Sequence, residues 1–148
     1  MSTASNDDAS ANDDGPPRGR LVIHGGGEIN EEFRRLVLDV AGGPGVRVLA
    51  VPQATQRLDI WGTICDLWRE VGAGDAELLD SSDPARAREQ IDRADLIWMS
   101  SGDQCRLMTV LAGTGLPEAL RARYRAGATV GGISAGAAAM SAAMITGE

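Results

Sequence analysis

The feature that most constrains this fold is a regular alternation of short apolar runs with longer segments that carry apolar residues at helical spacing. The apolar runs lie at 21–24, 46–52, 76–80, 95–100 and 128–132. Strands inside a parallel sheet are covered on both faces, so they are apolar almost without interruption. The pattern therefore predicts an α/β fold, with a mainly parallel sheet between two helical layers.

The segments between these runs predict helices. The expected helices lie at 31–41, 60–71, 84–93, 104–113, 117–126 and 135–144. The first helix has an apolar stripe, formed by Phe33, Leu36, Val37, Val40 and Ala41. Asp83 and Pro84 are typical of an N-cap followed by proline at the first helical position. In a parallel sheet the loops after the strands form the site, which directs attention to HGGGE, PQATQ, SSGDQ and GGISAG.

Composition narrows the class of protein and its location. The 148 residues are 43% hydrophobic and carry a net charge of −7, which fits one domain and argues against binding nucleic acid. Residues 1–17 are rich in Ser, Asn and Asp and are expected to form a disordered leader before a domain at 18–148. The sequence has no run long enough to span a membrane and no signal peptide. Cys65 and Cys105 have no metal-binding spacing, so we expect reduced cysteines, a cytoplasmic protein and no cofactor.

The stretch GGISAGAAAM (131–140) places one serine where an apolar run meets a predicted helix. Gly132, Ser134 and Gly136 fit the Gly-x-Ser-x-Gly pattern of a nucleophile elbow, a turn too tight for large neighbours. Such a turn exposes the Ser134 hydroxyl and leaves the amide of Ala135 free to stabilise an oxyanion. The alternative is a small-residue helix start in which Ser134 is only an N-cap.

The loop SSGDQCRL (100–107) follows the preceding apolar run. We expect it to lie beside the serine turn, so that the amide of Gly102 or Asp103 supplies a second oxyanion donor and Gln104 reaches the substrate. The alternative is an ordinary strand-to-helix turn in which Asp103 caps the helix. The stripe of Trp61, Ile64 and Trp68 is assigned to the core or to a face between two copies of the chain.

The segments HGGGE, SSGDQCRL and GGISAGAAAMS, in this order, resemble the cyanophycinase branch of the cyanophycinase/dipeptidase E family of serine peptidases. That family shows a Gly-Gly-Asp-Gln-x-x-Leu loop and a Gly-Gly-Thr-Ser-Ala-Gly-Ala elbow. The resemblance implies a three-layer, flavodoxin-like domain similar to class I glutamine amidotransferases. It also implies Ser134 as nucleophile, an oxyanion hole from the backbone of Ala135 and of Gly102 or Asp103, and Gln104 on the substrate side.

The resemblance further implies a substrate. Cyanophycin has a polyaspartate backbone with arginine on each side-chain carboxyl, and its cleavage releases β-aspartyl-arginine dipeptides. An aspartyl dipeptidase or a non-catalytic binding domain of the same fold stays open as an alternative.

This chain departs from the family pattern in the catalytic histidine and acid and at two further positions. The family's catalytic histidine and acid follow the serine, so we expect them beyond residue 148, a domain incomplete at its C-terminus, and no turnover by this chain alone. The single histidine, His24, is assigned to filling a strand end rather than to catalysis. Ser101 replaces a glycine and Ile133 replaces a threonine of the family pattern.

Overall fold

One parallel sheet organises the molecule. The computed structural model describes residues 19–145, so the leader expected at 1–17 lies outside the described residues. The strands are β1 (Leu21–His24), β2 (Arg47–Val51), β3 (Asp75–Leu78), β4 (Leu96–Met99) and β5 (Thr129–Ile133). They pair in the order β1-β5-β4-β2-β3, and every pairing is parallel. The predicted α/β class is therefore confirmed.

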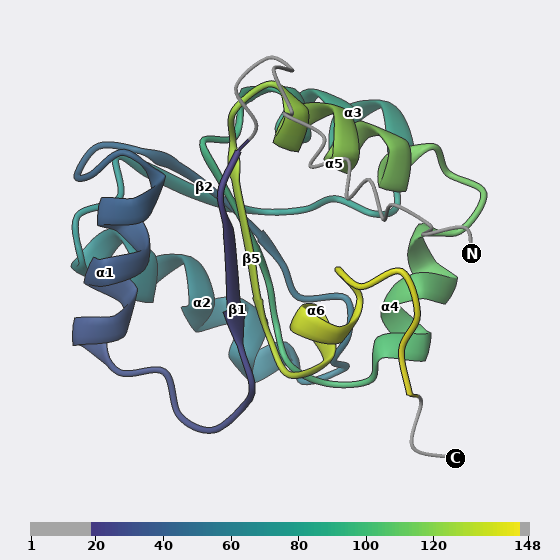
Figure 1. Cartoon of the computed structure of the whole chain (residues 1–148), viewed down its shortest axis with the longest axis horizontal. Coiled ribbons are helices and arrows are strands. Elements are labelled where there is room, and N and C mark those ends of the chain that lie inside the picture. The colour runs from purple at the N-terminus through teal and green to yellow at the C-terminus, as the bar shows by residue number, and fades with distance from the viewer. Residues whose placement is uncertain (1–18, 146–148) are drawn as a thin grey trace, which may run out of the picture.

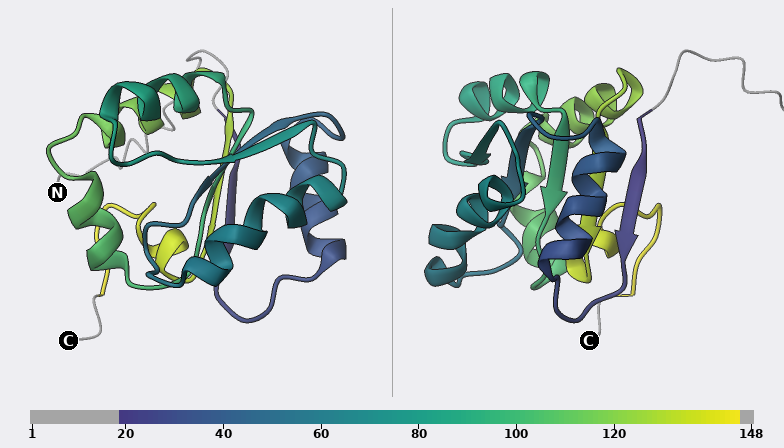
Figure 2. Two further views of the ribbon diagram at one scale, coloured as in Figure 1. Left: turned by 180° about the vertical axis from the view of Figure 1, so that it is seen from behind. Right: turned by 90° about the vertical axis from the view of Figure 1, so that its left-hand side faces the viewer.

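Helices cover both faces of the sheet. They are α1 (Glu31–Ala41), α2 (Leu58–Glu70), α3 (Pro84–Arg93), α4 (Gln104–Leu111), α5 (Leu116–Arg125) and α6 (Ala135–Ala138). In Figure 1 the sheet is seen nearly edge-on, with α1 and α2 on its left and the other helices on its right. Figure 2 shows the same layers from behind and from the side. Among residues 19–145, no helix has the length and apolar character needed to cross a bilayer.

Two apolar cores fill the spaces between these layers. Alternate residues of a strand point to opposite faces, and β4 shows this with four buried side chains. Leu96 and Trp98 join the core under α1 and α2, while Ile97 and Met99 join the core under α3, α4 and α5. Central strands covered on both faces explain why their sequences are apolar throughout.

Two sequence expectations about helices were wrong. Leu36 of the predicted α1 stripe is 57% exposed, and Leu38 is buried in its place. The last helix ends at Ala138 instead of 144. The hydroxyl of Ser141 lies 2.6 Å from the carbonyl oxygen of Ala138 and 2.6 Å from that of Ala143. A serine that bonds nearby carbonyl groups competes with the backbone bonds of a helix, which accounts for the early end.

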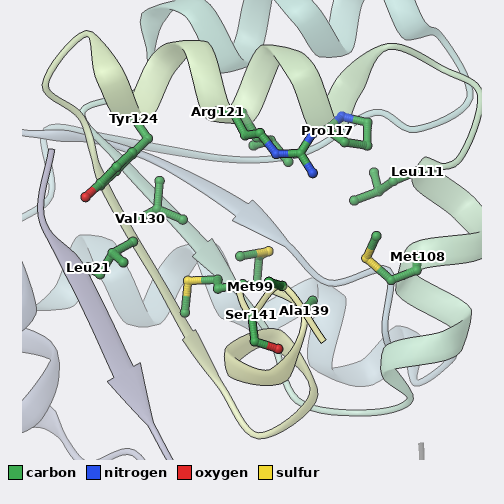
Figure 3. Close-up of a pocket in the computed structure, with 13 residues that line it drawn as sticks. Leu21, Met99, Met108, Leu111, Pro117, Arg121, Tyr124, Val130, Ala139 and Ser141 are labelled. Carbon is green, nitrogen blue, oxygen red and sulfur yellow. The ribbon is translucent and has the colours of Figure 1, made fainter. Parts of the chain in front are cut away.

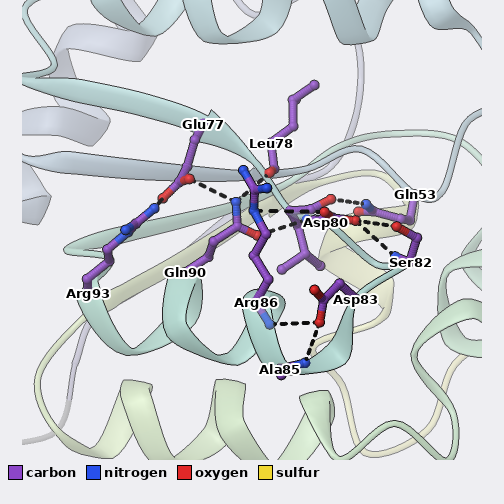
Figure 4. Close-up of polar contacts among 11 residues, drawn as sticks. Gln53, Glu77, Leu78, Asp80, Ser82, Asp83, Ala85, Arg86, Gln90 and Arg93 are labelled. Atoms are coloured by element: carbon purple, nitrogen blue, oxygen red, sulfur yellow. Dashed lines mark hydrogen bonds and ion pairs between the residues drawn. The ribbon is translucent and has the colours of Figure 1, made fainter.

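A buried amide fastens the edge strand β3 to α3 (Figure 4). The side chain of Gln90 is 2% exposed and donates to Glu77 Oε2 and to the carbonyl of Leu78, at 2.8 and 2.9 Å. Its oxygen accepts from the amide of Asp80 at 2.8 Å. Arg93 forms an ion pair with the same Glu77. Burial alone would raise the pKa of Glu77, but the hydrogen bonds from Gln90 and Arg93 outweigh it and lower that pKa.

Candidate active site

Ser134 occupies a strained turn between β5 and α6. Its φ of 52° and ψ of −109° make it the one non-glycine residue with positive φ among residues 19–145. Its amide donates to the carbonyl of His24 at 2.9 Å, which ties the turn to β1, and the residue itself is exposed. Backbone strain of this kind costs folding free energy and concentrates at functional sites.

The two glycines of the pattern are required by close packing. A Cβ on Gly132 would lie 2.6 Å from the carbonyl carbon of Gly136. A Cβ on Gly136 would lie 2.2 Å from the carbonyl oxygen of Met99 at the end of β4. The small residues therefore bring α6 directly against the strands. The turn has the strand–turn–helix context in which Gly-x-Ser-x-Gly presents a nucleophile.

The loop after β4 leaves the same edge of the sheet. Met99 pairs with Gly132, so the chains continue side by side beyond the two strands. Gly102 has a φ of 141°, and a Cβ there would lie 2.3 Å from the carbonyl oxygen of Ala54. This close approach to the loop after β2 fixes the path of the chain through Gly102.

Asp103 must be removed from the expected oxyanion donors. Its amide already donates to the carbonyl of Ala54 at 2.8 Å, so that N–H is not free for a substrate. Its side chain accepts from the amides of Cys105 and Arg106, at 2.8 and 3.1 Å, and thus caps α4. The alternative reading of Asp103 as a helix cap is the one that the hydrogen bonds support.

The oxyanion prediction needs backbone amides that are not already hydrogen-bonded, and the amides of Gly102 and Ala135 meet this condition. Within residues 19–145, neither amide has a hydrogen-bond partner. Because α6 has only four residues, the stabilisation of an anion at Ala135 depends on the individual N–H group more than on a helix dipole.

Gln104 is the first residue of α4 and lies against the end of the described chain. Its side-chain nitrogen donates to the carbonyl of Ile145 at 2.7 Å. The segment after α6 therefore passes beside Gln104. The role of Gln104 on the substrate side stays a prediction.

The surroundings of His24 agree with a structural role. Its ring packs edge-to-face on Phe33, with centroids 4.8 Å apart, on the α1 side of the sheet. Nδ1 accepts a hydrogen bond from the amide of Gly26 at 3.3 Å. A Cβ built on Gly26 would lie 4.0 Å from the Cβ of Ser134. The glycine-rich loop after β1 (25–27) therefore borders the serine turn.

The two substitutions in the family pattern fit the backbone. Ser101 has no positive φ, since Ser134 is the one non-glycine residue of the described range that does. The loop therefore does not need a glycine at 101. Ile133 is 7% exposed and belongs to the core under α1 and α2.

The larger of two relevant cavities is separate from the serine. It has a volume of about 410 Å³ and lies between α4, α5 and the segment after α6 (Figure 3). Met99, Met108 and Tyr124 line it, but Ser134 does not. A smaller cavity of about 230 Å³ reaches the residues next to the predicted site, Ser101 and Ile133.

Arg34 and Ser100 are among the polar residues of this smaller cavity that were not predicted from the sequence. A signal for Arg34 was available, because it precedes the buried Val37 and Leu38 by three and four residues and so shares their helix face. Ser100 gave no such signal, because a serine after a strand is common in loops.

Cysteines and metal ligands do not extend the site. Cys65 and Cys105 are unpaired, and burial raises the pKa of the Cys65 thiol. Residues 19–145 contain no group of three His, Cys, Asp or Glu side chains placed to hold a metal ion.

With this geometry in view, comparison with known proteins identifies the family. Residues 21–148 match the model of peptidase family S51. The chain belongs to this family. Cyanophycinase from Geminocystis herdmanii (strain PCC 6308) is 34% identical over 140 residues, covering 88% of this chain and 52% of the relative. Cyanophycinase from Trichormus variabilis (strain ATCC 29413 / PCC 7937) is 31% identical over 137 residues, covering 86% of this chain and 46% of the relative.

Solved structures show the same S51 fold. A peptidase from an acI-B1 Actinobacterium aligns with a TM-score of 0.67 and 26% identity, covering 84% of this chain and 57% of that chain. A putative peptidase E protein from Listeria monocytogenes EGD-e aligns with a TM-score of 0.65 and 19% identity, covering 82% of this chain and 61% of that chain. At this identity the alignment shows a likeness of fold alone. The resemblance to the cyanophycinase/dipeptidase E family is thus confirmed. This S51 chain spans about half the length of the curated relatives it matches.

Proposed function

We propose that this chain carries the nucleophile and oxyanion hole of a serine peptidase that hydrolyses the polyaspartate backbone of cyanophycin. The observation that carries the proposal is the exposed Ser134, which is held at positive φ between two glycines whose surroundings leave no space for a Cβ. The similarity to two cyanophycinases supports the choice of substrate.

The proposed reaction begins at the hydroxyl of Ser134. Its oxygen attacks the carbonyl carbon of the scissile peptide while a general base takes the hydroxyl proton. The carbonyl oxygen becomes negatively charged and accepts hydrogen bonds from the amides of Ala135 and Gly102. The amine leaves with a proton, and water then hydrolyses the acyl-serine ester. Gln104 is assigned to the substrate side, at the rim of this site.

The general base is not His24 in this proposal. Nδ1 of His24 is engaged by Gly26, and its ring is packed on Phe33. A serine without a base reacts slowly, so we expect the 148-residue chain by itself to have no turnover. Dipeptide release by the purified chain that is lost in Ser134→Ala would contradict this expectation.

The direct test uses the product of the complete reading frame that contains these residues. Purified protein is incubated with cyanophycin, and β-aspartyl-arginine is measured by chromatography. We expect the unaltered protein to release the dipeptide and the Ser134→Ala variant to release none. The control variant Ser82→Ala should release it normally, because Ser82 lies in the loop after β3, at the far edge of the sheet. Release that persists in Ser134→Ala would overturn the assignment of the nucleophile.

A parallel assay separates the alternative activities. The same protein is offered aspartyl dipeptides, and Ser134 is probed with a fluorophosphonate. Cleavage of the dipeptides without release from cyanophycin would indicate an aspartyl dipeptidase. Absence of both cleavage and labelling would indicate a non-catalytic domain of the fold.

A further inference from the structure

The cavity of about 230 Å³ is formed where the site loops meet α1 and α2. Its lining is mostly apolar and includes both buried tryptophans, Trp68 and Trp98, whose ring centroids are 5.5 Å apart. Ser101 and Ile133 also line the cavity, and they immediately precede Gly102 and Ser134 in the sequence. Its volume suits a single amino-acid residue more than an extended ligand.

Two polar side chains of this cavity are incompletely bonded. Ser100 is 6% exposed, and its Oγ has no hydrogen-bond partner among the described residues. Its amide donates to the carbonyl of Val51 at 3.1 Å, which holds the backbone of Ser100 in place. The buried Nε of Arg34 also lacks a partner in the described range. Buried polar groups without partners are uncommon in native proteins, and a ligand is one way to satisfy them.

Arg34 is positioned rather than mobile. One terminal nitrogen of its guanidinium donates to the carbonyl of Ile29 at 2.7 Å, which fastens the side chain to the loop before α1. Within residues 19–145 it forms no ion pair with a carboxylate. Anchored guanidinium groups of this kind are well suited to bind carboxylates.

The charge of the cavity favours an anion. Arg34 is the one charged residue among those that line it. Of the acidic residues nearest to Arg34 in the sequence, Glu31 pairs with Arg35 at 2.6 Å, and neither Glu28 nor Glu32 lines the cavity. Arg34 thus gives this mostly apolar cavity a positive charge, in a chain with a net charge of −7.

We propose that this cavity is a substrate subsite in which Arg34 and Ser100 bind a free α-carboxylate, while the apolar walls receive the aliphatic stem of the same residue. The arginyl groups of cyanophycin have this chemistry, because each is attached through its α-amine and keeps its α-carboxylate. The identity of the ligand rests on the proposed function. The presence of a carboxylate subsite does not, because it depends only on the cavity and its polar groups.

The test measures binding by the fluorescence of the tryptophans that line the cavity. The probes are β-aspartyl-arginine and the same dipeptide with a C-terminal amide. We expect the acid to bind about tenfold or more tightly than the amide, the size of effect that a charged hydrogen bond supplies. Arg34→Gln should abolish this preference, whereas Arg34→Lys should keep part of it.

Matched variants separate the subsite from folding and from catalysis. Arg35→Gln, the neighbouring arginine that pairs with exposed Glu31, should bind as the unaltered protein does. Ser100→Ala should weaken binding of the acid without lowering the melting temperature, because the hydroxyl it removes has no partner. Ser134→Ala should retain binding, so a failed hydrolase assay would leave the subsite intact. Equal binding of acid and amide, no binding of either, or unchanged preference in Arg34→Gln would overturn the proposal.

Discussion

At the scale of single residues, the serine turn is governed by contacts too close for a side chain. Gly136 lies against the carbonyl of Met99, and Gly132 lies against Gly136 itself. Neither contact involves the hydroxyl of Ser134, so the geometry of the turn can be tested separately from its chemistry.

Gly136→Ala should destabilise the fold strongly. Its Cβ would lie 2.2 Å from the carbonyl oxygen of Met99, and relief would require movement of α6 or β4. We expect a loss of about 1–3 kcal/mol in the free energy of unfolding, measured with urea. The control is Gly62→Ala at an exposed position of α2, where nothing lies within 4 Å and alanine should stabilise the helix by about 0.5–1 kcal/mol. Equal stability of the two variants would contradict the packing argument.

Ser134 itself should show the cost of its backbone conformation. Glycine adopts φ of 52° and ψ of −109° more readily than alanine does. We therefore expect the Ser134→Gly protein to be more stable than the Ser134→Ala protein, by about 1–3 kcal/mol in the free energy of unfolding. Thermal denaturation of both proteins would measure the difference, and a more stable alanine variant would show that the turn is not strained.

At the scale of elements, Asp103 joins the candidate site to α4. Its side chain caps the helix, and its amide bonds Ala54 on the loop after β2. The loop through Gly102 is therefore held by two elements that are distant in the sequence.

Removing the cap should loosen this loop. Asp103→Ala eliminates the acceptor for the amides of Cys105 and Arg106, and we expect a loss of about 1 kcal/mol in the free energy of unfolding. Asp103→Asn keeps an acceptor oxygen and should lose much less. Urea denaturation of both variants gives the comparison, and identical losses would argue against a capping role.

The sequence predicted elements better than it predicted contacts between them. Strand and helix positions follow from apolar periodicity, which is local, so β1 and α1 were predicted with the bounds that the structure has. The hydroxyl of Ser141 bonds the carbonyl of Ala138, where α6 ends, and periodicity does not show this bond. The amide of Asp103 is not free for an oxyanion because it bonds Ala54, 49 residues away. The cavity at Arg34 and Ser100 joins segments that periodicity cannot bring together.

At the scale of the whole molecule, Asp95, which directly precedes β4, links this strand to β2, β5 and α5. It accepts from the amide and the side chain of Arg47 at the start of β2, and it lies 3.7 Å from the guanidinium of Arg123 in α5. Its own carbonyl accepts from Thr129 at the start of β5. Burial alone would raise the pKa of Asp95, but the hydrogen bonds from Arg47 outweigh it and lower that pKa.

The lowered pKa of Asp95 predicts a dependence of stability on pH. The stabilisation is fully present above the unfolded pKa of about 3.9 and disappears as the pH falls through the lower folded value. Asp95→Asn should therefore be less stable than the unaltered protein at pH 7, with a difference that shrinks below about pH 4. Denaturation over this range measures it. A difference in stability between the two proteins that stays constant with pH would contradict this linkage.

The position of β1 at the sheet edge leads to an expectation about the opening of the serine turn. This four-residue strand pairs only with β5 within the described sheet, and Leu21 and Ile23 are 51% and 67% exposed. Edge segments with few buried contacts open first in native-state hydrogen exchange. Since the Ser134 amide donates to His24 on that strand, its exchange rate should follow the fraying of β1. A molecule that binds along this edge should slow that exchange and keep the Ser134 turn in its folded geometry.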